Sequence, residues 1–359
     1  MSGIIPPQFH VSIPDDRVAL YPPEKRGESK LLVVDCAGQS VIHVGHFRDI
    51  TNYVSNDLIV LNETKVLPAR VFGNRATGGG VELLFLVTSL QPLADSESPD
   101  QVKQARVAAL LSTSRRPQPG LVIQLPDNAT FQVVDRSEHG GWEGIWTTTS
   151  GKDFEEWLTG VGVPPLPPYI KRPVEVADHE RYQTVYAHTP GSIAAPTAGL
   201  HFTPEMLKQL KNAGAEIARL TLNVGWGTFE PIKTTDLNQH VMHSESYDIP
   251  TNTAKLINSA KNEHRKILAV GTTSIRALEA AAKISMPIQG GAGDATLFIY
   301  PPYQFKIVDK VLTNFHRPDS TLLQLIAALT GWELLNEVYQ RALDEDFHFF
   351  SYGDAMLIV

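Results

Sequence analysis

Two kinds of residue pattern divide this chain, and the boundaries between them limit the folds that it can adopt. From Val66 to Gly151, short apolar runs follow one another with Gly-, Pro- or Asn-rich breaks and without helical periodicity: VELLFLV, ARVAALL, LVIQL, FQVVD and GIWTTT. Closely spaced strands separated by turn residues are typical of a small antiparallel unit that can close into a barrel. Residues 66–151 are therefore predicted to form a small β-barrel domain, in which the polar segment 88–104 is a hairpin tip.

Strands and helices alternate on both sides of this unit. Before it, LIVL at residues 58–61 is an apolar strand candidate. After it, the patterns predict a helix at 154–162, a strand that stops at 225–227, a strand, turn and helix at 266–283, strands at 296–300 and 310–315, one long helix at 319–343 capped by Asp319 or Ser320, and a last strand at 355–359. We expect an α/β fold: a large α/β domain formed from both ends of the chain, residues 1–65 and 152–359, into which the antiparallel barrel is inserted.

Composition narrows the class of protein. A chain of 359 residues with 42% hydrophobic and 19% charged residues is long enough for two domains that each bury a core. We find no apolar run of membrane-spanning length and no signal peptide, and the single cysteine, Cys36, cannot form an internal disulfide, so a cytoplasmic protein is expected. A net charge of -8 argues against indiscriminate coating of nucleic acid, although a local basic stripe can still bind phosphate.

The run from Tyr182 to Thr203, YQTVYAHTPGSIAAPTAGLHFT, gathers hydroxyls, rings and imidazoles between turn residues. Its Pro and Gly turns interrupt regular structure and free backbone amides. We interpret it as a loop that buries little and forms part of a site. For any single residue in the run, the alternative is that it belongs to an ordinary ordered surface loop and has no role in a site. Within it, His201 beside Phe202 is the best candidate for a general base. The Pro-rich segment 164–173 is predicted to be an irregular linker with a lining role.

Polar side chains stand at the ends of several predicted strands, where an α/β sheet forms its ligand crevice: Asn62, Asn314, His316 and Asp354. Thr272 and Thr273 begin a predicted helix and could seat an anion, and Arg276 could bind a phosphate or carboxylate in a bidentate manner. Simple helix capping and surface ion pairs are the alternatives. The glycine spacing of a dinucleotide fingerprint is missing.

Two imidazoles and a carboxylate lie close together at His240, His243 and Glu245. An HxxH spacing has low specificity, and such pairs commonly transfer protons or form hydrogen bonds without a metal. We therefore predict no metal site, and a metal-dependent hydrolase is a less favoured alternative function.

Eight blocks stand out along the sequence: LNETKVLPAR (61–70), PPLPPYIKR (164–172), the run 182–203, LNVGWGTFEPI (222–232), HSESYDI (243–249), VGTTSIRALE (270–279), NFHRPDSTLL (314–323) and SYGDAMLI (351–358). Together they resemble the S-adenosylmethionine:tRNA ribosyltransferase-isomerase family of queuosine biosynthesis. Eight blocks in family order are much more specific than any single motif. The resemblance implies a large α/β domain from both chain ends and an inserted β-barrel, in agreement with the patterns above.

The resemblance also implies a reaction. Members of this family take the ribosyl part of S-adenosylmethionine and place it on the 7-aminomethyl-7-deazaguanine base at the tRNA wobble position, forming epoxyqueuosine with release of adenine and methionine. S-adenosylmethionine would be a consumed co-substrate, with no other cofactor. The expected partners are S-adenosylmethionine and a tRNA anticodon loop, and we expect a monomer.

This chemistry suggests roles for particular residues. The sulfonium acidifies the ribose C5′ proton, so we assign proton transfer to His201 and a second acid/base role to His243 and Glu245. We expect aromatic side chains to bind the sulfonium and basic side chains to bind tRNA phosphates. The aromatic candidates are Tyr182, Tyr186 and Phe229; the basic candidates are Lys65, Arg70, Lys171, Arg172 and Arg276; the other expected substrate-binding residues are Asn62, Thr197, Gly199, Phe202, Gly227, Thr228, Thr272, Thr273, Asn314, His316, Tyr352 and Asp354.

The chain departs from the family pattern at two positions. Arg317 stands before Pro318 where the family usually has leucine, and Pro302 follows Pro301 where it usually has glycine. A divergent or non-catalytic tRNA-binding member of the family is therefore the main alternative to an active enzyme.

Overall fold

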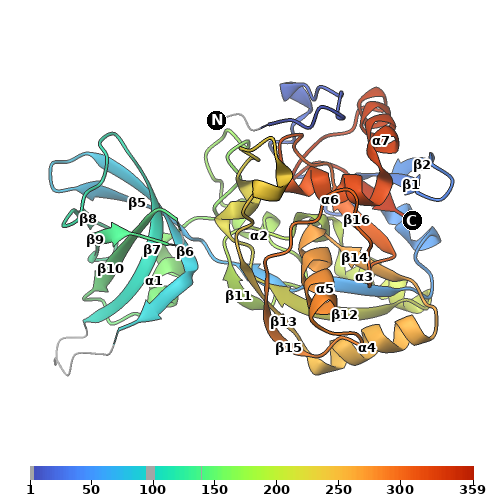
Figure 1. Ribbon diagram of the computed structural model, residues 1–359. Coiled ribbons are helices and arrows are strands. Elements are labelled where there is room, and N and C mark those ends of the chain that lie inside the picture. Colours follow the sequence, from blue (N-terminus) through green and yellow to red (C-terminus); the bar gives the residue numbers. More distant parts are fainter. Residues whose placement is uncertain (1–3, 94–101, 139) are drawn as a thin grey trace.

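A computed structural model describes residues 4–93, 102–138 and 140–359. In this part of the chain, a closed β-barrel stands beside a larger α/β domain, and two segments of chain connect them (Figure 1). The larger domain takes strands from both ends of the sequence, so the predicted fold class is confirmed. No helix among these residues is long and apolar enough to cross a membrane.

A mixed sheet, with nine strands in the described residues, forms the centre of the larger domain. Strands β12, β3, β14 and β16 run parallel, β17 is antiparallel to β16, and β1 is parallel to β17. Four carboxyl ends and the amino ends of β17 and β1 therefore meet at one end of the sheet. From edge to edge the strands are β15 (Gly291–Ala295), β13 (Glu245–Ile249), β12 (Glu216–Leu222), β3 (Leu58–Asn62), β14 (Ile267–Val270), β16 (Lys310–Asn314), β17 (Ala355–Ile358), β1 (Lys30–Asp35) and β2 (Ser40–His46).

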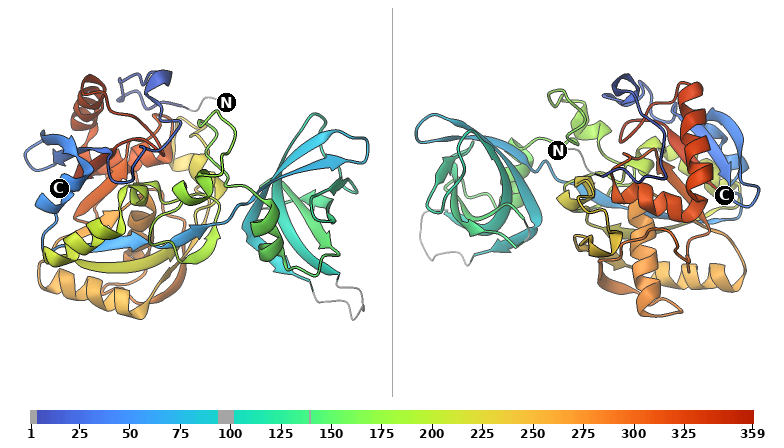
Figure 2. Two further views of the ribbon diagram at one scale, coloured as in Figure 1. Left: turned by 180° about the vertical axis from the view of Figure 1, so that it is seen from behind. Right: turned by 45° about the horizontal axis from the view of Figure 1, so that its top comes forward.

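Helical layers cover both faces of this sheet (Figure 2). Side chains along a strand alternate between faces, so in β3 Leu58 and Val60 point to one layer and Ile59 and Leu61 to the other. The first layer comprises α4 (Thr251–Asn262), α5 (Thr272–Ile284), α6 (Thr321–Thr330) and α7 (Trp332–Asp344). The second comprises η2 (Phe47–Asn52), η3 (Thr197–His201) and α3 (Pro204–Asn212).

Short elements complete the larger domain. A two-stranded parallel sheet joins β4 (Thr64–Val66) to β11 (Thr189–Ser192). The other short elements are η1 (Asp15–Arg17), α2 (Asp178–Arg181), η4 (Trp226–Phe229) and η5 (Leu237–Gln239).

The inserted domain is a closed antiparallel barrel, built in the described residues from β10 (Trp142–Thr148), β7 (Lys103–Thr113), β6 (Gly80–Pro92), β5 (Arg70–Arg75), β8 (Val122–Gln124) and β9 (Ala129–Arg136). The predicted hairpin tip includes residues 94–101, which lie outside the described residues; its flanks continue β6 and β7. Helix α1 (Phe154–Val161) packs into the barrel core, where Trp157 lies 5.3 Å from the ring of Trp146. The domain limits 66 and 151 stay a prediction, and the packing of α1 favours a second limit after Val161.

Two predicted elements are wrong. Residues 296–300 are irregular, and the edge strand is instead β15, whose glycines let it approach β13: a Cβ at Gly293 would lie 2.6 Å from the Tyr247 ring. The predicted helix 319–343 is divided at Gly331, whose φ of 75° does not continue a helix. Ser320 caps α6 by accepting the amide of Leu323 at 3.2 Å.

The run 182–203 is mostly buried, which contradicts the expectation that it buries little. Its β11 segment pairs with β4, and Phe202 packs edge-on against Phe47 with ring centroids 5.0 Å apart. The turn residues and aromatic rings of this run are therefore part of the core. The prediction failed because the polarity of a short segment does not reveal which of its surfaces a neighbouring layer will cover.

Candidate functional site

A cavity opens at the end of the sheet where the carboxyl ends of the strands meet. Its walls come from η3, the loop after β12, the start of α5, the end of β16 and the segment before β17. About 750 Å³ of space at this site, part of which is open solvent, is not filled by protein atoms. Parallel strands and the turns that follow them thus create the crevice that the strand-end residues predicted.

The cavity wall combines apolar groups with hydroxyls and a few titratable side chains. Apolar contacts come from Ala194, Ala195, Ala198, Phe315 and Phe350; hydroxyls from Tyr169, Thr197, Thr228, Thr272, Thr273, Thr313, Ser320 and Ser351; and titratable or charged groups from Glu230, His316, Arg317 and Asp319. Among the residues that the sequence assigned to the substrate, those that line this cavity are Thr197, Thr228, Thr272, Thr273, Asn314 and His316. Of the four strand-end residues that the sequence predicted, Asn314 and His316 line the cavity, whereas Asn62 and Asp354 do not.

The start of α5 faces this cavity. The chain leaves β14 and turns at Gly271, with φ 84°, before α5 begins at Thr272. Glycine has no side chain to cap the first amides, and no side-chain cap is present at this end in the described structure. Amides at a helix start favour a negatively charged ligand group, so this wall suits a carboxylate better than a cation.

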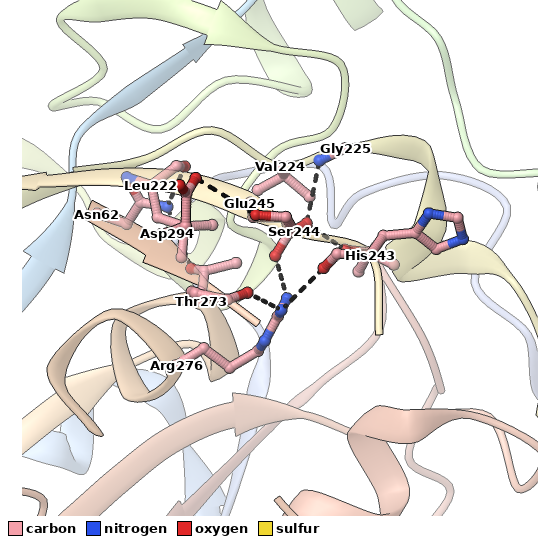
Figure 3. A network of polar contacts seen from close by, with 12 residues as sticks. Asn62, Leu222, Val224, Gly225, His243, Ser244, Glu245, Thr273, Arg276 and Asp294 are labelled. Carbon is pink, nitrogen blue, oxygen red and sulfur yellow. Dashed lines mark hydrogen bonds and ion pairs between the residues drawn. The ribbon is translucent and has the colours of Figure 1, made fainter. Parts of the chain in front are cut away.

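Arg276 and Glu245 form a buried ion pair beside the cavity, with side chains only 5% and 2% exposed (Figure 3). Arg276 also donates to the carbonyl of Ala295 at 2.7 Å. Glu245 accepts the amide of Gly225 at 3.0 Å and the hydroxyl of Thr228 at 2.7 Å. The pair therefore ties α5 and the β13–β15 edge to the loop that carries Thr228 into the cavity wall.

These contacts change how the two residues are interpreted. The sequence predicted that Arg276 binds a tRNA phosphate. The guanidinium is instead buried and bonded to a carboxylate and a carbonyl, so it is not available to a phosphate. The carboxylate of Glu245 is likewise occupied by three donors and does not line the cavity.

Asn62 is also fully engaged within the protein. Its amide donates to the carbonyl of Leu222 at 3.0 Å and to Thr273 Oγ1 at 3.2 Å. Its side-chain oxygen accepts the amides of Leu222 at 3.0 Å and Thr64 at 3.2 Å. Asn62 therefore joins β3, β12 and α5 under the cavity and is absent from the cavity lining.

The residues of the candidate metal site do not converge. His243 Nε2 lies 3.2 Å from Glu230 Oε2 near the surface, His240 contacts the ring of Phe298, and Glu245 turns inward to its ion pair. Within residues 4–93, 102–138 and 140–359, no group of three or more His, Cys, Asp or Glu side chains is placed to hold a metal ion.

His201 lies behind the cavity wall and is 4% exposed. Its Nδ1 is 2.7 Å from Ser29 Oγ and its Nε2 is 3.3 Å from Asn314 Nδ2. Burial, assisted by the positive charge of Arg26, lowers the pKa of His201 to about 4. The imidazole is therefore neutral at pH 7, and Asn314, not His201, lines the cavity.

Tyr182 and Tyr186, the predicted sulfonium contacts, belong to apolar clusters and do not line the cavity. A Cβ at Gly199 would overlap Tyr186 Oη, so this glycine makes room for a ring and does not approach a ligand.

The other loop residues pack in a similar way. A Cβ at Gly227 would overlap the ring of His243, and Phe202 is fully buried against Phe47. The backbone of Phe229 is part of η4, but its side chain lies outside the described part of the chain.

The basic candidates fall into two groups. Lys65 and Lys171 are exposed. Arg172 forms a bidentate pair with Asp178, at 2.7 Å for both contacts, and Arg70 donates to the carbonyl of Leu166 at 3.1 Å. The two lysines are thus the candidates whose charges face solvent.

Tyr352 and Asp354 form hydrogen bonds within the protein. Tyr352 donates to Asp178 at 2.9 Å. Asp354 accepts the amides of Lys30 at 2.7 Å and His348 at 2.8 Å, which joins the starts of β1 and β17. Neither residue lines the main cavity.

Sequence reasoning missed several residues of the cavity wall. Tyr169 lies 5.0 Å from the Phe350 ring, and its Oη is 2.5 Å from Ser351 Oγ. Tyr169 belongs to the Pro-rich segment that was predicted to have a lining role, and Ser351 begins a quoted block. Glu230 lies in the quoted block 222–232 but was not selected as a site residue, and nothing in the sequence pattern signals Phe350. Arg317, which departs from the family pattern, also lines the cavity.

These features define an α/β protein with an appended β-barrel and a cavity for a small, partly polar ligand at the carboxyl ends of its parallel strands. Comparisons with known proteins identify the group within this class. The profile of the family described as "Queuosine biosynthesis protein" matches residues 7–358, so the chain belongs to this family.

Relatives agree over the whole length. The S-adenosylmethionine:tRNA ribosyltransferase-isomerase of Trichlorobacter lovleyi is 43% identical, covering 98% of this chain and 99% of its own. The protein of the same name from Geobacter metallireducens is 44% identical, with 98% of both chains covered. The crystal structure of S-adenosylmethionine tRNA ribosyltransferase from Thermotoga maritima is similar with a TM-score of 0.55 and 29% identity, covering 98% of this chain and 100% of that one.

Proposed function

We propose that this protein transfers and isomerises the ribosyl moiety of S-adenosylmethionine onto the 7-aminomethyl-7-deazaguanine base at the tRNA wobble position. The products are epoxyqueuosine in tRNA, adenine and methionine. The observation that carries the proposal is the cavity at the strand ends, within a chain that matches ribosyltransferase-isomerases over its full length. We further propose that the protein acts in the cytoplasm as a monomer.

The cavity suits S-adenosylmethionine in the distribution of its polar and apolar groups. The amides and hydroxyls at the start of α5 would bind the methionine carboxylate, and the apolar wall with Tyr169 and Phe350 would receive the adenine ring. Tyr169 is the tyrosine that lines the cavity, whereas Tyr182 and Tyr186, which the sequence predicted, do not.

The assignment of proton transfer to His201, His243 and Glu245 stays a hypothesis, and the geometry favours supporting roles for all three. None of them lines the cavity. Glu245 holds the loop that presents Thr228, and His243 contacts Glu230 in that loop. Among the groups that do line the cavity, the carboxylates of Glu230 and Asp319 and the imidazole of His316 are able to accept a proton.

The activity is tested by incubating the protein with S-adenosylmethionine and tRNA that carries the aminomethyl-deazaguanine base. We expect free adenine only when both substrates are present, and no adenine when the wobble base is an unmodified guanine. Methylated tRNA together with S-adenosylhomocysteine would contradict the proposal. Binding of tRNA without any release of adenine would favour the non-catalytic alternative.

Lys65 and Lys171 are proposed to contact tRNA phosphates, because both are exposed. Replacing each with alanine is expected to weaken tRNA binding and to lower the slope of log Kd against log salt by about 1. Lys255, exposed on α4, provides the matched control, and Lys255→Ala is expected to leave that slope unchanged. Equal slopes for all three variants and the wild type would remove the two lysines from the tRNA interface.

A further inference from the structure

The side-chain amide of Asn314 has an orientation that the surrounding protein determines. Its Nδ2 donates to the carbonyl of Phe350 at 3.0 Å. A carbonyl can only accept, so this contact identifies the nitrogen side of the amide without reference to any other group. The same Nδ2 lies 3.3 Å from His201 Nε2.

The orientation of Asn314 in turn determines the tautomer of His201. Because Nδ2 is a donor, Nε2 of the imidazole must carry a lone pair, and the ring proton must sit on Nδ1. Nδ1 lies 2.7 Å from Ser29 Oγ, which can accept that proton. Protonation of Nε2 would place two donors face to face, so the arrangement requires the neutral ring.

The backbone of Phe350 is also unusual at this point. Its φ is 71°, a conformation that is strained for a bulky residue. In this conformation its carbonyl accepts from both Asn314 Nδ2 and the amide of Gly353, at 3.0 and 3.1 Å, while its side chain contributes to the cavity wall. Strain of this kind persists at sites where surrounding structure enforces it.

One polar atom is left over in this arrangement. Asn314 is 2% exposed and lines the cavity, yet its Oδ1 has no hydrogen-bond partner among the described residues. A buried acceptor without a donor is costly to a folded protein, so this oxygen calls for a donor that arrives with a ligand. Since Nδ2 faces His201 and Phe350, Oδ1 occupies the opposite side of the amide.

The surroundings restrict what that donor can be. Asn314 is next to Phe315 and near Phe350, and the imidazole behind it is uncharged. The contacts of the Asn314 amide are with the His201 ring and the Phe350 carbonyl and not with a carboxylate, so its free oxygen suits a neutral N–H better than a desolvated ammonium group, which needs a counter-charge. The aromatic rings of Phe350 and Tyr169 add a surface on which a purine can stack.

We infer that Asn314 Oδ1 accepts a hydrogen bond from the exocyclic amine of the adenine ring of S-adenosylmethionine, and that His201 is a positioning residue that holds the Asn314 amide for this contact. The inference rests on the proposed function for the identity of the ligand. It assigns His201 a role different from proton transfer: the neutral imidazole accepts from Nδ2 and thereby keeps Oδ1 turned toward the ligand.

Binding measurements with two inert analogues test the acceptor directly. S-adenosylhomocysteine carries the exocyclic amine, and S-inosylhomocysteine carries a carbonyl oxygen in its place. We expect the wild type to bind the first about 10- to 100-fold more tightly, because the second would set two acceptors against each other. In Asn314→Leu this preference is expected to fall to about 3-fold or less.

Two variants of His201 separate positioning from proton transfer. Glutamine places an acceptor oxygen near the position of Nε2 but cannot act as a base, whereas leucine supplies no acceptor. We expect His201→Leu to raise the KM for S-adenosylmethionine about 10-fold with a smaller effect on kcat, and His201→Gln to recover most of that loss. A His201→Gln variant as inactive in adenine release as His201→Leu, with normal analogue binding, would restore the proton-transfer role and overturn the inference.

The same measurements distinguish this inference from the proposed function. If the wild type binds both analogues equally well, the Asn314 contact is wrong while the proposed function stands. If the wild type binds neither analogue, the inference is overturned, and the adenine-release assay alone decides the proposed function. Circular dichroism of Asn314→Leu shows whether a loss of binding reflects unfolding, and in that case the two His201 variants decide the outcome.

Discussion

Replacing Arg276 with methionine is expected to lower the free energy of unfolding by about 3–5 kcal/mol. Methionine is unbranched like arginine but shorter and uncharged, so the Glu245 carboxylate, whose side chain is 2% exposed, would stay buried without its counter-ion. Breaking one side of a buried pair costs more than the pair itself contributes, because the remaining charge has lost its hydration. Denaturant unfolding of the full chain measures the effect.

A matched control uses an ion pair that remains in contact with water. Arg265 bonds to Glu216 at 3.0 Å, and their side chains are 26% and 39% exposed. Arg265→Met is expected to cost about 1 kcal/mol or less. A double variant in which Arg276 and Glu245 are both methionine should lose less than the sum of the single changes, because no unpaired charge remains. A loss below about 1 kcal/mol for Arg276→Met would contradict the proposed importance of the pair.

Acidification is expected to destabilise the protein between about pH 6.5 and pH 3, through two buried histidines. Burial lowers the pKa of His201 to about 4 and that of His316 to about 3. The unfolded chain, with ordinary histidine pKa values near 6.5, takes up protons in this window that the folded state does not. The stability that these groups contribute is therefore complete above about pH 6.5 and is lost as the pH falls through the two folded pKa values.

The contribution of His201 is on the order of 3 kcal/mol, given a folded pKa of about 4, and that of His316 is of the same order or larger. Unfolding free energies measured from pH 7.5 to pH 4 test this. In His201→Gln the pH slope is expected to be shallower, because one titrating group has gone. His179, exposed on α2, is the control, and His179→Gln should leave the slope as it is in the wild type. Identical slopes for all three proteins would show that His201 is not held neutral.

Local patterns predicted the fold well where strands are continuous apolar runs or are bounded by turn residues. β3 and β16 end in asparagine, and β14 ends at a glycine before α5, so their limits are visible in the sequence. The barrel strands were recognisable from their spacing, except β5, which was not singled out. The edge strand β15 was missed because strands were predicted from apolar runs. This strand is instead made of small residues that fit against Tyr247 of β13.

The candidate site was predictable only in part, for a different physical reason. Strand-end position identified Asn314 and His316 as cavity residues, since parallel strands bring their carboxyl ends together, but it also selected Asn62 and Asp354, which do not line the cavity. The start of a predicted helix identified Thr272 and Thr273. The use of each polar side chain depends on partners that are distant along the chain. Arg276 meets Glu245 across 31 positions, and Asn314 meets His201 across 113. No local pattern reveals such pairs.

By itself, the sequence determined the α/β class, the inserted barrel and some of the residues that line the cavity at the strand ends, because periodicity, turn residues and strand termini are local properties. Only the tertiary structure shows that Arg276 forms a buried ion pair and that His201 contacts Asn314. It also shows that Tyr169 lines the cavity, whereas Tyr182 and Tyr186 do not. Burial and hydrogen-bond competition assign these roles, and both depend on which elements pack together.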